Sequence, residues 1–157
     1  MNGIIYIFGP SCSGKSTLGK ALQKHLGGQW TYLDRDQLIE DGLCVESGAD
    51  KTLEERIQAI GNRIIIDTQI PWRDKNPDDV YCLLPPPLKT LLERDALRTE
   101  RLKRPEPRAS YAKQYVIDTH ETLSAIAQEK FDICVDSSLV STKETALKIS
   151  QFLENKV

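Results

Sequence analysis

The chain has 157 residues, and its 21 Lys and Arg against 23 Asp and Glu give a formal net charge of −2. This length predicts one compact domain over residues 1–157, and four cysteines are too few for a disulfide-stapled mini-protein. The near-neutral charge argues against a protein that coats nucleic acid, because such binding needs many cations. It does not argue against one local phosphate site.

No run approaches the roughly 18 apolar residues that a membrane span requires, and the start of the chain lacks the basic residues of a secretory signal. We therefore expect a cytoplasmic protein without a membrane partner. Cys12, Cys44, Cys82 and Cys134 form no Cys-x-x-Cys pair. Zinc and redox motifs need such close pairs, so we interpret the cysteines as reduced, mostly buried thiols.

Five short apolar runs alternate with amphipathic segments along the chain. The runs cover residues 4–8, 31–33, 64–67, 80–84 and 133–135. Most are continuous rather than alternating, which is typical of parallel strands buried on both faces. Apolar stripes at helical spacing lie between them, at Leu18, Ala21, Leu22 and Leu26, at Leu53, Ile57 and Ile60, at Tyr111, Tyr115, Thr119, Leu123 and Ile126, and at Ile149 and Leu153. This alternation predicts an α/β domain with helices on both faces of a parallel sheet.

Several residues mark where the predicted helices begin and end. Thr52-x-x-Glu55 and Ser141-x-x-Glu144 are capping boxes, and Gly61 is expected to end the helix that Thr52 begins. The proline-rich residues 85–87 and 103–108 predict the start of a helix and a surface loop, respectively.

The residues from Gly9 to Ser16 match the phosphate-binding pattern G-x-x-x-x-G-K-[ST], between an apolar strand and a helical stripe. The two glycines allow backbone N–H groups to converge on phosphates at a helix N-terminus. Lys15 would bridge the β- and γ-phosphates, and the Ser16 hydroxyl would complete a Mg²⁺ shell. A glycine turn that fits the pattern by chance is the alternative. The predicted nucleotide-binding residues are Gly9, Pro10, Ser11, Cys12, Ser13, Gly14, Lys15, Ser16 and Thr17.

Asp67 ends the third apolar run, and parallel strands deliver such side chains to the carboxyl edge of a sheet, where ligands bind. We expect Asp67 to hold Mg²⁺ together with Ser16, directly or through water. A carboxylate that caps the next turn is the alternative. Trp72 follows closely enough to line an acceptor pocket, although packing is the alternative for this side chain.

Asp34 and Asp36 come at the end of the second run. If the strand continues, the two carboxylates point the same way and face the transferable phosphate together. We predict that Asp36 is the base that takes the proton of the acceptor hydroxyl and that Asp34 is a partner of Mg²⁺ or water. For Asp36, capping the helix that follows is the alternative.

One segment is basic in an otherwise acidic chain. Residues 89–113 hold eight Lys or Arg and four Asp or Glu, a net charge of +4, which leaves −6 for the rest. Arg94, Arg98 and Arg101 have helical spacings of four and three, so they share one face. Guanidinium groups clamp a transferring phosphoryl group, so we predict a lid role for at least one of Arg98, Arg101 and Arg104. Solvated surface arginines are the alternative.

With these residues in place, the chain resembles the small P-loop kinases of the nucleoside- and shikimate-kinase-like group, and within it chloramphenicol phosphotransferase-like proteins. The motifs that carry the resemblance are the phosphate loop, Leu33-x-x-Asp36, Ile64 to Asp67, Arg98-x-x-Arg101 and Val135-Asp136-Ser-Ser. The resemblance implies a three-layer P-loop kinase fold with sheet order 2-3-1-4-5 and an Arg-rich lid over about residues 98–112. It also implies ATP and Mg²⁺ as cosubstrates, a small hydroxyl-bearing acceptor, Asp36 as base and Arg98 with Arg101 as the lid pair.

Three interpretations of function stay open. The leading one is an ATP-dependent phosphotransferase that acts on a hydroxyl of a small molecule. Leu33-Asp-Arg-Asp36 is also similar to polynucleotide 5′-hydroxyl kinases and zeta-toxin-like kinases, although the acidic remainder of the chain gives little support for nucleic acid. A nucleotide-binding switch that has no acceptor is the third. The sequence carries no signal for the oligomeric state.

Overall fold

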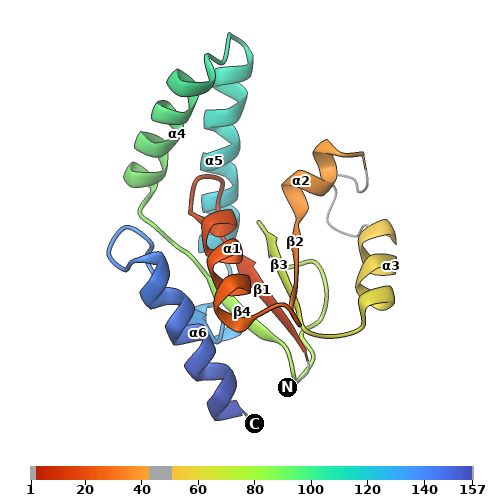
Figure 1. Ribbon diagram of the computed structural model, residues 1–157. Coiled ribbons are helices and arrows are strands. Elements are labelled where there is room, and N and C mark those ends of the chain that lie inside the picture. Colours follow the sequence, from red (N-terminus) through yellow and green to blue (C-terminus); the bar gives the residue numbers. More distant parts are fainter. Residues whose placement is uncertain (1–2, 43–50, 157) are drawn as a thin grey trace.

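The computed structural model describes residues 3–42 and 51–156 (Figure 1). Five strands form one sheet in the order β2-β3-β1-β4-β5, and every neighbouring pair is parallel. The strands are β1 (Ile4–Phe8), β2 (Thr31–Asp34), β3 (Ile64–Thr68), β4 (Val80–Leu83) and β5 (Ile133–Cys134). This confirms the predicted sheet order and the five predicted strands. Within the described residues, no helix has the length and apolar character needed to cross a membrane.

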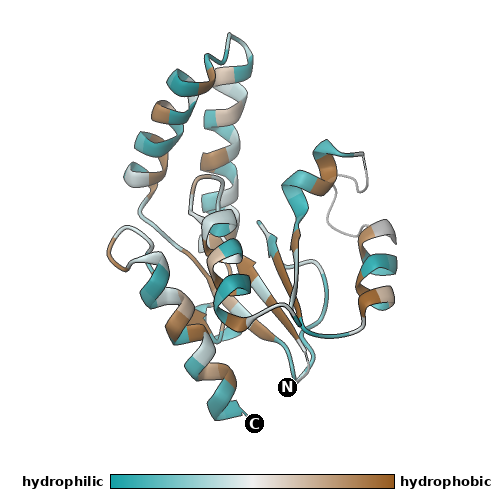
Figure 2. Cartoon of the chain, in the orientation of Figure 1, coloured by the Kyte–Doolittle hydropathy of each residue, from teal (hydrophilic) through white to brown (hydrophobic). Residues whose placement is uncertain are grey.

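Helices cover both faces of the sheet, as predicted. They are α1 (Lys15–Leu26), α2 (Arg35–Glu40), α3 (Lys51–Ile60), α4 (Leu88–Leu102), α5 (Arg108–Ser124) and α6 (Thr142–Lys156), with a short 3-10 turn at Gln128–Lys130. Side chains alternate along β1, so Ile5 and Ile7 pack against α1 and α6, whereas Tyr6 and Phe8 pack against α3 and α5. Figure 2 shows the resulting apolar centre, with the hydrophilic residues concentrated on the helices.

The helix α4 and the first half of α5 form a hairpin that stands away from the sheet (Figure 1). Val116, Thr119 and Leu123 of α5 are buried. The predicted apolar stripe is therefore confirmed at Thr119 and Leu123. It is wrong at Tyr111 and Tyr115, which are 71% and 50% exposed, because this part of α5 lies beside α4 rather than on the sheet.

Two of the predicted helix boundaries are confirmed. The Ser141 hydroxyl accepts the N–H of Glu144 at 3.2 Å, which caps the start of α6. Gly61 has φ 88° and its N–H donates to the Ile57 carbonyl at 2.8 Å, so it ends α3 in the left-handed region that favours glycine. The side chain of Thr52 lies outside the described residues.

The cysteines are less buried than expected. Of the three that the structure describes, none forms a disulfide, and only Cys82 is buried. Cys12 is half-buried, and Cys134 is exposed because β5 is a two-residue strand at the edge of the sheet. The expectation of mostly buried thiols is therefore wrong for these two cysteines. Cys44 lies outside the described residues.

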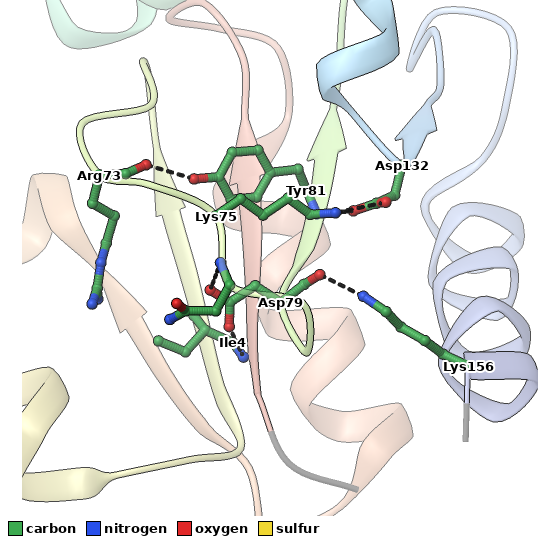
Figure 3. A network of polar contacts seen from close by, with 8 residues as sticks. Ile4, Arg73, Lys75, Asp79, Tyr81, Asp132 and Lys156 are labelled. Atoms are coloured by element: carbon green, nitrogen blue, oxygen red, sulfur yellow. Dashed lines mark hydrogen bonds and ion pairs between the residues drawn. The ribbon is translucent and has the colours of Figure 1, made fainter.

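The connection between β3 and β4, residues 69–79, is described throughout and contains neither helix nor strand. It returns the chain to the amino edge of the sheet, where the buried Asp79 fastens it (Figure 3). The Asp79 carboxylate accepts the N–H of Ile4 at 3.1 Å and the N–H of Asn76 at 3.2 Å. Its backbone carbonyl accepts the ammonium of Lys156 at 2.7 Å. One residue therefore joins β1, β4 and the end of α6.

A second set of polar contacts extends this network to β5 (Figure 3). The N–H of Tyr81 donates to the Asp132 carboxylate at 2.8 Å, and Lys75 forms an ion pair with the same carboxylate at 2.9 Å. The Tyr81 hydroxyl donates to the Arg73 carbonyl at 2.9 Å. These contacts tie together the amino ends of the strands. They do not involve the carboxyl edge, where ligands bind in sheets of this kind.

Candidate active site

The phosphate-binding pattern forms a loop between β1 and α1, as its residues predict. A Cβ on Gly9 would lie 2.3 Å from the Ser13 hydroxyl oxygen, so only glycine fits at this position. Gly14 has φ 95° and Cys12 has φ 70°, and both lie in the left-handed region. The loop thereby turns directly into the N-terminus of α1, where backbone N–H groups favour anions.

Lys15 is buried at the first position of α1, and its ammonium donates to the Pro10 carbonyl at 2.9 Å. Burial lowers the pKa of Lys15, while the carboxylates of Asp36 and Asp67 oppose this shift. The lysine thus lies across the phosphate loop and close to the predicted acidic residues. This is where it has to be if it is to contact a bound phosphate.

Asp34 and Asp36 are brought to the site by a different local structure from the one that we expected. The strand ends at Asp34 and α2 begins at Arg35, so the condition that the strand continues to Asp36 is not met. Asp34 caps α2 by accepting the N–H of Gln37 at 3.1 Å, and its other carboxylate oxygen accepts the Ser16 hydroxyl at 3.4 Å. The capping role considered for Asp36 therefore belongs to Asp34.

Asp67 lies at the end of β3 and is 2% exposed. The Tyr32 hydroxyl donates a hydrogen bond to its carboxylate. Burial raises the pKa of Asp67 to about 6, and the hydrogen bond from Tyr32 acts in the opposite direction. The structure thus joins Ser16 to Asp34 and places Tyr32 over Asp67. Sequence reasoning missed Tyr32, because no motif marks it.

The Tyr32 ring is held in place by α1. A Cβ on Gly19 would lie only 2.5 Å from Cε1 of this ring, so the absence of a side chain at Gly19 makes room for it. The pKa of Tyr32 is raised mainly by burial and, to a smaller extent, by the negative charge of Asp67. The hydroxyl therefore stays protonated and can donate a hydrogen bond. Tyr32 therefore connects α1 to the buried carboxylate.

A cavity of about 620 Å³ opens at the carboxyl edge of the sheet. The phosphate loop forms its floor, Asp34 and α2 form one wall, and α4 forms the other. Its lining residues are Ser11, Cys12, Gly14, Lys15, Ser16, Thr17, Asp34, Asp36, Gln37, Glu40, Arg94, Leu97, Arg98 and Arg101. The structure thus brings Asp36, Lys15, Arg98 and Arg101 to one cavity.

The arginines of the basic segment have different surroundings. Arg98 and Arg101 line the large cavity. Arg104 instead forms a largely buried ion pair with Asp95 at 3.1 Å, and it also donates to the Thr99 hydroxyl at 3.1 Å. Of the three arginines considered for the lid, Arg98 and Arg101 therefore line the cavity, whereas Arg104 is paired with side chains of α4.

A second cavity of about 220 Å³ adjoins the first. It lies between the phosphate loop, α4 and the segment that joins β5 to α6. Its lining residues are Cys12, Gly14, Thr17, Leu18, Leu84, Arg94, Ser137, Val140, Thr142 and Thr145. The two cavities share four of these residues, Cys12, Gly14, Thr17 and Arg94, so one ligand can extend from one to the other.

Trp72 lines neither of these two cavities. Its indole N–H donates to the Glu54 carboxylate at 3.0 Å, and its ring meets the edge of Tyr6 at a centroid distance of 5.7 Å and an angle of 74°. This placement matches the packing alternative. No three His, Cys, Asp or Glu side chains form a ready metal site among residues 3–42 and 51–156. Mg²⁺ needs no such group beside a nucleotide, because it commonly takes one or two carboxylates together with phosphate oxygens and water.

Comparisons with known proteins agree with this geometry. Residues 2–60 match a family model described as chloramphenicol phosphotransferase-like protein. A comparison with curated proteins finds no match. A shikimate kinase from Acinetobacter baumannii, solved with shikimate, has a TM-score of 0.63 and 22% identity, over 99% of this chain and 95% of that one.

Two further solved structures cover nearly the whole chain. A gluconokinase from Sinorhizobium meliloti has a TM-score of 0.59 and 19% identity, over 98% of this chain and 94% of that one. An uncharacterised protein from Eubacterium ventriosum has a TM-score of 0.67 and 14% identity, over 99% of each chain. At these identities the similarity concerns the fold. The chain therefore has the α/β fold of the small P-loop kinases, with an N-terminal segment similar to chloramphenicol phosphotransferase-like proteins.

Proposed function

We propose that this chain is an ATP-dependent kinase that phosphorylates a hydroxyl group of a small molecule. One observation carries the proposal: a single cavity is lined by the phosphate loop, by Arg98 and Arg101, and on the opposite wall by the carboxylate of Asp36. Phosphoryl transfer needs these three elements together, which are an anion cradle, cations for the charge that develops and a base for the acceptor. The similarity of fold to kinases of small molecules supports the same conclusion.

The phosphate side of the reaction is assigned to the loop and the lid. Backbone N–H groups at the start of α1 bind the phosphates, and Lys15 exchanges the Pro10 carbonyl for a phosphate oxygen. Arg98 and Arg101 supply positive charge to the transferring group from α4. We propose the whole chain as one kinase domain, in which about residues 98–112 form the lid.

Ser16 and Asp34 are the residues that would hold Mg²⁺, because their oxygens already lie 3.4 Å apart beside the phosphate loop. When bound, the ion would neutralise phosphate charge. Asp67 adds negative charge to the same region, and the charge of Asp34 is one of the causes that raise the pKa of Asp67. Asp67 is buried and does not line the cavity, so we propose that it acts on the ion through water.

The acceptor side of the reaction is assigned to α2. Asp36 is exposed in the first turn of this helix and lines the cavity opposite the lid arginines. It takes the proton of the acceptor hydroxyl as the oxygen attacks the γ-phosphorus. Gln37 and Glu40 lie on the same wall and offer hydrogen bonds to further polar groups of the acceptor. The smaller cavity near Ser137 would hold the nucleoside part of ATP.

Substituting Asp36→Asn tests this proposal. We expect the turnover number to fall by about 10²–10⁴-fold, which is the usual contribution of a general base to the rate. ATP binding should be retained. The assay follows transfer from labelled ATP to a panel of small alcohols, and calorimetry measures ATP binding. Asp78→Asn is the matched control, because Asp78 is an exposed carboxylate in the connection between β3 and β4 that lines neither cavity. Full transfer activity in Asp36→Asn would refute the assignment.

The same assay separates the other two interpretations. A 5′-hydroxyl oligonucleotide added to the panel detects polynucleotide kinase activity, which needs an extended cationic groove. The described cationic residues that line the cavity, Lys15, Arg94, Arg98 and Arg101, instead lie on the phosphate loop side and on α4. Slow ATP hydrolysis without transfer to any acceptor would indicate a nucleotide-dependent switch.

A further inference from the structure

The phosphate loop is held from outside by residues that its motif does not contain. When successive N–H groups of a loop face a phosphate, the carbonyl groups point away from it and need donors of their own. The Pro10 carbonyl receives the ammonium of Lys15, which belongs to the motif. The carbonyls of Cys12 and Ser13 receive their donors from α4 and from the segment between β5 and α6.

Ser137 supplies the shortest of these contacts. Its hydroxyl donates to the Ser13 carbonyl at 2.6 Å, across 124 residues of sequence. The same hydroxyl accepts one N–H of the Arg94 guanidinium at 3.1 Å, and that guanidinium nitrogen also donates to the Cys12 carbonyl at 3.0 Å. The second guanidinium nitrogen donates to the Ser137 carbonyl at 3.4 Å. The hydroxyl of Ser137 is therefore both a donor and an acceptor, and alanine can replace neither role.

Packing places this hydroxyl against the turn that begins α1. A Cβ built on Gly14 would lie 3.9 Å from the Ser137 hydroxyl oxygen, so Ser137 lies close to the glycine at which the loop enters α1. Three segments that are far apart in sequence meet here: the phosphate loop, the middle of α4 and the segment after β5. The neighbouring residue Ser138 has no part in the contact, because it is exposed and its hydroxyl donates to Asp136 at 2.5 Å.

We infer that Ser137 is a positioning residue for nucleotide binding, which keeps the phosphate loop in its anion-binding conformation through the Ser13 carbonyl and Arg94. Its hydroxyl hydrogen is directed at the loop carbonyl, so it acts on the phosphates only through the loop. A loop that is held in shape before the ligand arrives binds more tightly, because less conformational freedom is lost on binding. The inference rests on the proposed nucleotide site.

The test compares Ser137→Ala with Ser138→Ala in the full chain. Calorimetry measures the Kd for ATP and for inorganic tripolyphosphate, which has phosphates but no nucleoside. We expect Ser137→Ala to weaken both ligands by a similar factor of about tenfold, and Ser138→Ala to change neither by more than about twofold. Hydrogen exchange without ligand should be faster for the loop amides of Ser137→Ala than for those of the wild type.

Two other results for Ser137→Ala would overturn the inference. Weaker ATP binding with unchanged tripolyphosphate binding would show that Ser137 contacts the nucleoside. Unchanged binding of both ligands would show that Ser137 has no role in binding. Ser137→Thr retains the hydroxyl and should bind ATP within about threefold of the wild type. A loss equal to that of the alanine variant would assign the effect to shape and overturn the inference. A wild-type chain that binds neither ligand would refute the proposed function itself.

Discussion

The buried carboxylate of Asp67 gives a prediction in which the pH dependence is decisive. In Asp67→Asn the charge is removed, while the amide oxygen can still accept the Tyr32 hydroxyl. Burial raises the pKa of Asp67 from 3.8 to about 6, so the folded state disfavours the ionised form. Two units of pKa correspond to about 3 kcal/mol of unfolding free energy, which is an upper bound. Lys15 loses a favourable neighbour in the variant, so we expect a net gain of about 1–3 kcal/mol.

The sign follows from proton binding. A raised pKa means that the folded state binds a proton more tightly than the unfolded state. The contribution of Asp67 to stability is therefore fully present below about pH 4 and is lost as the pH rises through about 6. We expect Asp67→Asn to be more stable than the wild type near neutral and alkaline pH, and to show no advantage in acid.

The assay is urea unfolding followed by far-UV circular dichroism across this pH range, with a chelator present so that no divalent cation contributes. Asp78→Asn controls for the loss of one exposed charge on the surface. The reasoning is refuted if Asp67→Asn is less stable than the wild type at high pH, or if the difference in unfolding free energy is constant across the pH range.

Three further substitutions test other parts of the structure. Gly19→Ala should lower the unfolding free energy by about 1–3 kcal/mol because its Cβ meets the Tyr32 ring. In a Tyr32→Ala background the same change should raise it by about 0.5–1 kcal/mol through helix propensity, which a double-mutant cycle in urea measures. Asp79→Ala removes the acceptor of the buried Ile4 N–H and of the part-buried Asn76 N–H, and should cost about 1–3 kcal/mol in thermal unfolding. Arg101→Ala should lower kcat about 100-fold with ATP affinity little changed, unlike the exposed Lys103→Ala, and equal kcat values would contradict the lid assignment.

The fold could be predicted because its signals are local. The residues from Ile4 to Phe8 are apolar without interruption, as is typical of a strand buried on both faces, and the structure buries all five. The phosphate loop could be predicted because its glycines meet local requirements of the backbone. In the structure, Gly9 has no room for a Cβ, and Gly14 has a positive φ. The cavity likewise contains Asp36, Arg98 and Arg101, whose residue types suit phosphate chemistry.

The rest depends on which distant segments meet. Tyr32 and Asp67 are 35 residues apart, and Ser13 and Ser137 are 124 residues apart. A local sequence pattern therefore cannot predict either hydrogen bond. Tyr111 has the spacing of a core residue but belongs to a hairpin that leaves the sheet. Periodicity indicates which face of a helix is apolar, but it cannot indicate whether a sheet lies beneath that face.

The central position of β1 has a consequence for how the protein is made. Ile4 pairs with Ile64 in β3, and Ile5 pairs with Val80 in β4. Contacts of such long sequence separation form slowly, because the chain must close large loops before they stabilise it. During synthesis β1 therefore emerges well before both of its partners. The strand β1, which is apolar throughout and leads into the phosphate loop, stays unpaired until β3 emerges, and its paired residues Ile4 and Ile64 are 60 positions apart. An exposed segment of this kind is prone to aggregate. Expression of the chain should therefore be sensitive to temperature and to the supply of chaperones.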